Sequence, residues 1–303
     1  MDRKISFNTS LVRLDELEKQ LGLKAKIYAK QDYENKTGSA KYRPAVYILK
    51  GAFERGLLKE GGTIIEATSG NTGIALACAA KDYSCNACII MPDNMSRERI
   101  RMIESYGGQI VLTPACEGMA GAVKKAKAIK ESMHDSFIAD QFNNPDNVKA
   151  HYCTTGPEIL NQLEEIDFFV AGIGTGGTIS GTGKYIKEKK PDVKIIGVEP
   201  LSSPLLTKGT AGAHKIQGIG ANFIPSILDT SVIDRIIDVS DEDAYKFTKI
   251  LAKNKIMCGI SSGAAFKAAV EIAMQEENEG KNIVVFLTDS ADRYYSTGIY
   301  EGI

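Results

Sequence analysis

The chain has 303 residues, enough for a large core, and this length favours two lobes. Its 37 Lys and Arg residues nearly balance its 38 Asp and Glu residues, so the net charge of −1 gives no general attraction to nucleic acid or to a membrane surface. The first residues lack the apolar stretch of a secretory signal, and no apolar run approaches the roughly 20 residues that span a bilayer. We therefore expect a cytoplasmic protein that binds neither nucleic acid nor membranes.

The six cysteines are scattered along the chain, which is typical of reduced thiols. Cys85 and Cys88 form a C-x-x-C pair, a spacing that also occurs in redox and zinc sites. A redox pair normally opens a helix, whereas this pair leads into an apolar run that favours a strand, where side chains three apart face opposite ways. No second pair completes a zinc site, and the three histidines lack metal-ligand spacing. These patterns predict structural thiols and no metal site.

Apolar, β-prone segments alternate with helical segments along the chain. Strands are expected at 8–14, 24–30, 63–67, 87–91, 109–113, 136–139, 167–171, 193–199, 233–239 and 282–287. Helices are expected at 45–58, 72–81, 96–106, 118–132, 145–163, 177–189, 241–254 and 261–275. Strands joined by helices indicate parallel, doubly wound sheets. The alternation falls into two blocks that meet near residues 142–145, which predicts two α/β lobes.

A glycine-rich loop, residues 172–177, follows the strand expected at 167–171 and precedes a helix. Glycines let the backbone approach an anion closely, and a helix start offers free N–H groups and a favourable dipole. The spacing Gly172-x-Gly174-x-x-Gly177 also matches the dinucleotide fingerprint, and Glu199 ends the next strand where a ribose-binding acid would lie. The loop alone leaves two alternatives open: a dinucleotide, or the single phosphate ester of a cofactor such as pyridoxal phosphate.

Two more loops combine glycines with hydroxyls at helix starts. Residues 68–73, Thr-Ser-Gly-Asn-Thr-Gly, place hydroxyls, an amide and N–H groups where they could grip a carboxylate. Ordinary N-capping needs one such residue, so the surplus points to a ligand. In the loop 258–265, by contrast, a serine cap would be a sufficient explanation. Lys41 ends the polar segment 35–41, and its residue type alone favours a solvated side chain.

Considered together, these segments resemble the pyridoxal-phosphate enzymes of fold type II, in the branch of cysteine synthase (O-acetylserine sulfhydrylase) and cystathionine β-synthase. Residues 68–73 resemble the substrate loop of that family, Gly-Thr-Gly-Gly-Thr at 174–178 its phosphate loop, and Gly-Ile-Ser-Ser-Gly-Ala-Ala at 259–265 the loop over the pyridine nitrogen. The segments 154–159 and 215–221 are similar to two more family segments. The resemblance extends over nearly the whole chain, and it disfavours the dinucleotide, which leaves the 68–73 loop and Lys41 without a role.

The resemblance implies an α/β fold of two doubly wound lobes, similar to the tryptophan synthase β subunit, with pyridoxal 5′-phosphate in the interdomain cleft. Residues 41–145 would form a smaller, mobile, substrate-binding lobe, and residues 1–40 and 146–303 a larger lobe that binds the cofactor phosphate. Lys41 would hold the cofactor as a Schiff base and then act as general base. Asn71 would bond the ring hydroxyl, and Ser261 would face the pyridine nitrogen. The phosphate would be held by Gly174, Thr175, Gly176, Gly177 and Thr178, and the amino-acid substrate by Thr68, Ser69, Gly70, Thr72 and Gln141.

The implied reaction is β-replacement on a small amino acid, with cysteine formed from O-acetyl-L-serine and sulfide and acetate released. One alternative starts from L-cysteine or L-serine and releases hydrogen sulfide or forms serine, lanthionine or cystathionine. A second alternative is a non-catalytic partner of serine acetyltransferase, whose C-terminal tail enters the active site in this family. The intact Lys41, Asn71 and Ser261 argue against a non-catalytic protein. The resemblance also implies a homodimer.

The chain departs from the family pattern near its start and around the lysine. Ser10 stands where a proline is usual, Lys36 also replaces a proline, and Tyr42 follows Lys41 where aspartate is frequent. Because Lys36 and Tyr42 border the catalytic loop, they leave the choice of first substrate and of nucleophile open.

Overall fold

The computed structural model describes residues 7–303, which divide into two compact units. Unit 1 comprises residues 7–40 and 148–303, and unit 2 comprises residues 41–147. The boundary after residue 147 lies two residues beyond the expected one. Both units are α/β, and their sheets are built from parallel strands with a single antiparallel pair, which confirms the expected fold class.

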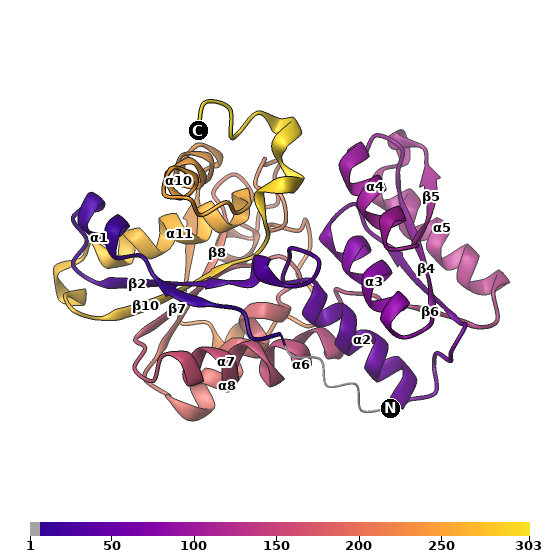
Figure 1. Ribbon diagram of the computed structural model, residues 1–303, viewed down its shortest axis with the longest axis horizontal. Coiled ribbons are helices and arrows are strands. Elements are labelled where there is room, and N and C mark those ends of the chain that lie inside the picture. The colour runs from indigo at the N-terminus through magenta and orange to yellow at the C-terminus, as the bar shows by residue number, and fades with distance from the viewer. Residues whose placement is uncertain (1–6) are drawn as a thin grey trace. The chain divides into compact units, whose positions relative to one another are not determined.

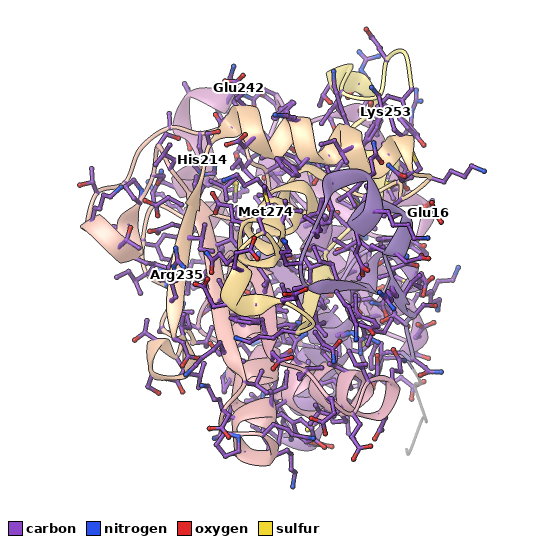
Figure 2. The ribbon with its side chains drawn as sticks, turned by 90° about the vertical axis from the view of Figure 1, so that its left-hand side faces the viewer. Glu16, His214, Arg235, Glu242, Lys253 and Met274 are labelled. Atoms are coloured by element: carbon purple, nitrogen blue, oxygen red, sulfur yellow. The ribbon has the colours of Figure 1, made fainter. Side chains whose placement is uncertain are left out.

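Unit 1 contains a six-stranded sheet in the order β1-β2-β10-β7-β8-β9. The strands are β1 Leu11–Arg13, β2 Lys26–Gln31, β7 Phe168–Gly172, β8 Lys194–Pro200, β9 Arg235–Val239 and β10 Asn282–Leu287. Only β1 runs antiparallel to its neighbour. Figure 2 shows Arg235 at the start of β9, the edge strand of this sheet.

Helices cover both faces of this sheet. Figure 1 shows α10 (Asp241–Lys253) and α11 (Ile260–Ala273) on one side, and α7 (Thr155–Gln162) and α8 (Gly177–Lys189) on the other. The side chains of β10 divide accordingly, because neighbouring residues of a strand face opposite ways. Val285 packs in the cluster with Phe266 of α11, whereas Val284 packs with Ile179 of α8. This two-sided burial explains the unbroken apolar sequence of β10. Unit 1 also contains the short helices α1 (Asp15–Leu21) and α9 (Leu205–Lys208).

Unit 2 contains a four-stranded parallel sheet in the order β5-β4-β3-β6. Its strands are β3 Thr63–Ala67, β4 Asn86–Pro92, β5 Gln109–Thr113 and β6 Ser136–Ile138, and its helices are α2 Tyr42–Glu54, α3 Asn71–Asp82, α4 Arg97–Ser105 and α5 Gly118–Ser132. Ile65 and Cys88 pack under α5, while a Cβ on Gly73 of α3 would lie 2.9 Å from Cγ2 of Ile89, so α3 and α5 cover opposite faces.

The cysteines agree with the interpretation as structural thiols. Cys88 is buried within β4, and Cys85 precedes that strand. All six cysteines, which lie in the described part of the chain, are free. Among residues 7–303, no helix is both long and apolar enough to cross a membrane.

The single helix expected at 145–163 is wrong, because the structure has two helices there, α6 (Pro145–Cys153) and α7. Pro157 lacks an N–H for the carbonyl of Cys153, and its ring would clash with that carbonyl in a continuous helix. The hydroxyl of Thr154 donates instead to the Ala150 carbonyl at 2.6 Å. The helix expected at 45–58 begins and ends earlier, at Tyr42 and Glu54, so the proline at position 44 lies inside its first turn.

Because α10 and α11 pack closely at Gly263, we expect that adding one methyl group at this position strongly destabilises the protein. A Cβ on Gly263 would lie 2.0 Å from Oγ1 of Thr248 and 2.5 Å from the carbonyl oxygen of Ala244. Because the backbone of α10 would have to move, we expect Gly263→Ala to lower the free energy of unfolding by about 2–3 kcal/mol. In the control Gly183→Ala, the Cβ would lie 3.2 Å from Cγ2 of Ile195, and the helix propensity of alanine offsets part of the cost. Urea unfolding would measure both; equal losses would contradict the prediction.

Candidate functional site

Three helices in the described chain have a glycine as their N-cap residue, so no N-cap side chain bonds their first N–H groups. Their N-cap residues are Gly70 for α3, Gly176 for α8 and Gly259 for α11. By contrast, the Ser240 hydroxyl caps α10 by accepting a hydrogen bond from the Asp243 N–H at 3.0 Å. The serine cap considered for the third loop is not present, because Ser261 lies inside α11 as its second residue. These three N-termini therefore keep main-chain donors and a positive dipole end for a ligand.

The loop between β7 and α8 lies against a second segment of unit 1. A Cβ on Gly174 would lie 2.4 Å from the carbonyl oxygen of Gly218, a distance that no side chain tolerates. Gly176 has φ +85°, the left-handed region that favours glycine. The Thr175 hydroxyl accepts a hydrogen bond from the Gly177 N–H at 3.3 Å. The glycines thus allow close backbone packing, and the loop directs main-chain donors toward the start of α8.

Ser261 lies beside the same second segment. A Cβ on Gly218 would be 3.7 Å from Oγ of Ser261, and the Ser261 side chain is almost fully buried. Its neighbour Ser262 accepts a hydrogen bond from the Thr288 N–H at 2.9 Å, which ties the start of α11 to the end of β10. Unit 1 therefore brings together three separate parts of the sequence, around Gly174, Gly218 and Ser261.

His151 supports the 174–178 loop from behind, a role that its sequence context did not indicate. Its Nε2 lies 3.2 Å from Oγ1 of Thr178, and its Nδ1 lies 2.9 Å from Oγ1 of Thr155. The ring is 2% exposed and packs edge-on against Phe286. The sequence shows only that this histidine lacks metal-ligand spacing. One signal for its contact with Thr155 was available in the sequence, because residues four apart lie on the same face of a helix. That signal is weakened here, because His151 belongs to α6 whereas Thr155 begins α7.

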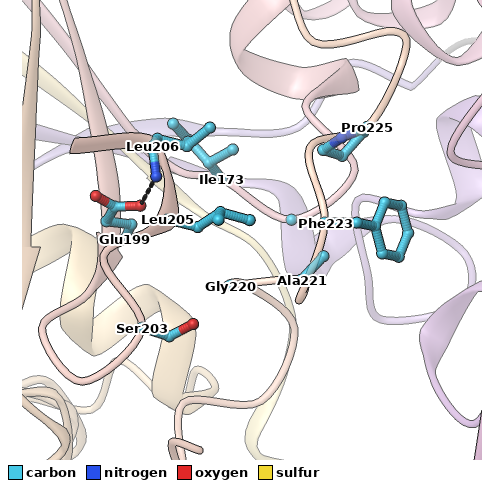
Figure 3. A pocket seen from close by; sticks show the side chains of 10 residues that line it. Ile173, Glu199, Ser203, Leu205, Leu206, Gly220, Ala221, Phe223 and Pro225 are labelled. Carbon is cyan, nitrogen blue, oxygen red and sulfur yellow. Dashed lines mark hydrogen bonds between the residues drawn. The ribbon is translucent and has the colours of Figure 1, made fainter. Parts of the chain in front are cut away.

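The Glu199 carboxylate is engaged in hydrogen bonds within the protein, which argues against a role in binding a dinucleotide. This buried carboxylate accepts hydrogen bonds from the N–H group of Leu206 at 2.9 Å (Figure 3) and from that of Thr207 at 3.0 Å. It therefore holds the start of α9. The pocket in Figure 3 lies beside this group and is also lined by Gly174, Gly220 and Phe223. The Gly220 carbonyl contacts Nε2 of His214, labelled in Figure 2, at 2.9 Å.

In unit 2, the structure brings the 68–72 loop to Gln141. The Thr72 hydroxyl donates to Oε1 of Gln141 at 2.5 Å, and both side chains are buried. The Gly70 N–H donates to the Thr68 hydroxyl at 3.3 Å. In the same loop, the Ser69 carbonyl accepts a hydrogen bond from Arg99 of α4 at 3.2 Å. Ser69, Gly70 and Asn71 remain partly exposed. The loop is therefore held by the buried contact between Thr72 and Gln141, while these three residues stay accessible to a ligand.

A buried carboxylate, Glu66, also supports Gln141. It is 3% exposed and accepts hydrogen bonds from the N–H groups of Asp140 at 2.8 Å and Gln141 at 3.4 Å. Burial raises the pKa of Glu66 to about 7, although both amides oppose that shift. The sequence offered no signal for this residue beyond its place at the end of a strand.

Lys41 is the N-cap residue of α2 and is partly buried. The residues before it are fixed within unit 1: Ser39 pairs with Asp289, and the Ala40 N–H donates to the Thr288 carbonyl at 2.8 Å. Within unit 2, the Tyr42 hydroxyl donates to Oδ2 of Asp82 at 2.9 Å, and burial raises the pKa of Tyr42. The unusual tyrosine therefore ties α2 to the end of α3, while Lys36 is exposed.

Comparison with known proteins decides the family. The family model described as pyridoxal-phosphate dependent enzyme matches residues 4–289. The chain belongs to this family. It is 48% identical to cysteine synthase B of Campylobacter jejuni over 294 residues, which cover 97% of this chain and 96% of that relative.

Two solved structures extend the similarity to the fold. Cysteine synthase from Entamoeba histolytica superposes with a TM-score of 0.94 at 40% identity, covering 99% of this chain and 93% of that one. A hydrogen sulfide-producing enzyme from Fusobacterium nucleatum superposes with a TM-score of 0.89 at 42% identity, covering 95% of this chain and 96% of that one. The family match, the similarity to cysteine synthases and the shared fold confirm the resemblance inferred from the sequence.

The position of His151 leads to a stability prediction. His151→Phe keeps an aromatic ring beside Phe286 but leaves the hydroxyls of Thr155 and Thr178 without their ring nitrogens. We expect a loss of about 1–3 kcal/mol in the free energy of unfolding, measured in urea, because these polar groups lose their partners. The same substitution at the exposed His134 serves as control and should change stability by less than about 0.5 kcal/mol. A His151→Phe protein as stable as the wild type would rule out the bridging role.

Proposed function

We propose that this chain makes L-cysteine from O-acetyl-L-serine and sulfide, releases acetate, and uses pyridoxal 5′-phosphate as its cofactor. One observation carries the proposal. The 174–178 loop packs so closely on Gly218 that only glycine fits at position 174, and Gly218 also lies beside Ser261. In a chain of this family, that arrangement supports binding of one cofactor through its phosphate and its ring nitrogen. The cysteine synthases among its relatives support the choice of reaction.

The groups around Gly174 fit a phosphate monoester. The N-terminus of α8 supplies main-chain N–H donors and a positive dipole end, and Thr175 and Thr178 add hydroxyl donors. Ser261 offers a hydroxyl to the ring nitrogen, and Asn71 an amide to the ring hydroxyl. When bound, pyridoxal phosphate supplies an aldehyde that takes up an amine covalently and a ring that accepts electrons from Cα of the substrate.

The chain's own residues would handle the substrate. Lys41 would hold the cofactor, leave it when the substrate amine arrives, and then remove the proton from Cα as general base. Thr68, Ser69 and Gly70, at the uncapped start of α3, would bind the substrate carboxylate. Oε1 of Gln141 accepts from Thr72, and its amide group also bonds the Glu66 carboxylate, so one amide N–H would be left as a donor to the substrate carboxylate.

A second candidate reaction begins from L-cysteine and releases hydrogen sulfide. The similarity to the hydrogen sulfide-producing enzyme of Fusobacterium nucleatum favours it. L-Serine as first substrate belongs to the same alternative. Three further properties remain predictions. A homodimer would be checked by measuring the molecular mass in solution, and a cytoplasmic location by cell fractionation. Binding of the serine acetyltransferase C-terminus would be checked by titration with that peptide.

The role of Lys41 predicts a spectroscopic change. Lys41→Ala should remove the visible absorption band of the lysine-bound cofactor and lower cysteine formation by at least about 10³-fold, because both the attachment point and the base are lost. Lys50→Ala is the control, since Lys50 lies exposed on the same helix and forms an ion pair with Glu54 of that helix at 3.7 Å. If the wild-type protein shows no such band after addition of pyridoxal phosphate, the cofactor proposal fails.

The choice of first substrate predicts a difference in turnover. We expect cysteine formation from O-acetyl-L-serine and sulfide to exceed hydrogen sulfide release from L-cysteine by at least about tenfold in kcat/KM, a difference of about 1.4 kcal/mol in transition-state stabilisation. Both rates should be measured on one preparation of the holoenzyme, with L-serine as a third substrate. A higher kcat/KM for L-cysteine would make the second candidate the function.

A further inference from the structure

Glu66 is the fourth of the five residues of β3, the strand that leads into the 68–72 loop, and it lies two residues before Thr68. Its neighbour Ile65 packs under α5, so the alternation of the strand directs Glu66 to the opposite face, where α3 lies. Its register partner on β4 is Ile89. A carboxylate in such an apolar layer is costly unless its oxygens find donors.

Those donors come from the turn after β6. Asp140 has φ +49°, an uncommon conformation for a residue with a side chain, and this turns its N–H and that of Gln141 toward Glu66. The Gln141 carbonyl accepts from Nδ2 of Asn147 at 2.8 Å. Glu66 and Asn147 therefore fix the main chain of the residue whose side chain meets Thr72.

The protonation state of Glu66 decides how many of these contacts exist. An ionised carboxylate accepts from both N–H groups, whereas a neutral carboxyl group carries a proton on one oxygen, which then faces an N–H instead of accepting from it. The contact to Gln141 is the longer one at 3.4 Å, so it is the one that gives way. Protonation thus loosens Gln141 while Asp140 stays bound.

The charges near Glu66 permit such a titration. Burial is the main reason that its pKa is raised, and the neighbouring Asp140 carboxylate raises it further, while the two amides and the Gln141 side chain lower it. Of the helices on this face, α4 directs Arg99 at the Ser69 carbonyl, and α3 contributes the neutral Thr72.

We propose that Glu66 is a positioning residue whose ionised carboxylate holds Gln141 in the geometry that binds the substrate carboxylate. Affinity for the amino acid then increases as Glu66 loses its proton. This inference rests on the proposed function, because it assigns the substrate carboxylate to Gln141 and the 68–72 loop.

The same titration affects stability in the opposite direction. The pKa of Glu66 rises from 4.5 to about 7 on folding, so between these values the folded state binds more protons than the unfolded one. The contribution of Glu66 to stability is therefore largest at acid pH and is lost as the pH rises toward 7. At a pH above the pKa of Glu66, Gln141 is therefore best ordered, and the contribution of Glu66 to stability is smallest.

The test compares Glu66→Gln with the wild-type holoenzyme in binding L-alanine, which shares the amine and carboxylate of the proposed substrate and lacks a leaving group. Glutamine resembles the neutral carboxyl group at every pH. By calorimetry, the ratio of the variant's Kd to the wild type's should be about 10 at about pH 8.5 and approach about 1 at about pH 5.5, as the wild-type group gains its proton. The ratio cancels the titration of the ligand and of Lys41.

Glu18→Gln is the matched control. Glu18 is also a buried carboxylate that accepts a main-chain hydrogen bond, from the Ile27 N–H at 2.9 Å, but it belongs to unit 1, whereas the 68–72 loop belongs to unit 2. Its ratio should stay near 1 at every pH. A ratio for Glu66→Gln that is large but independent of pH would show a structural role alone, and a ratio of 1 throughout would show none; either result overturns the proposal.

A measurement on the wild type keeps the inference testable if Glu66→Gln does not fold. Hydrogen exchange of residues 139–147, corrected for the intrinsic pH dependence, should show about tenfold more protection at about pH 8 than at about pH 6, while β2 serves as reference. Unchanged protection would overturn the proposal. Because this readout needs neither turnover nor substrate, it separates a failure of the Glu66 role from a failure of the proposed reaction, which would appear as absent cysteine formation by the wild type.

Discussion

Parallel pairing of β7 with β8 and β10 is the constraint on which the candidate site of unit 1 depends. Parallel strands place their carboxyl ends at one edge of the sheet, where open α/β sheets bind ligands. Each end here has a different task. The chain after β7 forms the glycine loop, the end of β8 carries Glu199 to hold α9, and the chain after β10 fixes both Ala40 and Ser262. The edge thus positions the loops that are proposed to bind the ligand and also the segment that leads to Lys41.

In unit 2, parallel strands also bring two loops together at one edge of a sheet, although the sheet is smaller. The ends of β3 and β6, which pair in parallel, supply the 68–72 loop and Gln141, and Glu66 joins the two ends through main-chain N–H groups. A side chain on β3 that holds the backbone after β6 fixes two loops at once. Such cross-links matter here because α3 begins at a glycine without a side-chain cap, so the loop before it cannot be held by ordinary capping.

The sequence predicted the elements with clear periodicity and the loops between them, since those depend on local residue types. It failed at Pro157, where a local rule was available, because the apolar periodicity on both sides suggested one helix. It could not predict His151 or Glu66 as supports, since their partners Thr178 and Gln141 lie 27 and 75 residues away along the chain. Gly174 illustrates the same limit: its pattern fitted two ligands, and only its packing against Gly218 explains why a side chain is excluded.

The position of Ser261 also bears on which reactions the proposed cofactor would support. As the second residue of α11, it lies at a helix start without a side-chain cap, where the dipole disfavours a further positive charge. A hydroxyl at this place can donate a hydrogen bond to a neutral ring nitrogen, whereas a carboxylate would stabilise a protonated one. The helix end and the serine therefore act in the same direction. A neutral ring nitrogen makes the ring a weaker electron acceptor, which suits loss of a leaving group from Cβ better than transamination or racemisation. Placed at this helix terminus, Ser261 would limit the chemistry of the proposed cofactor.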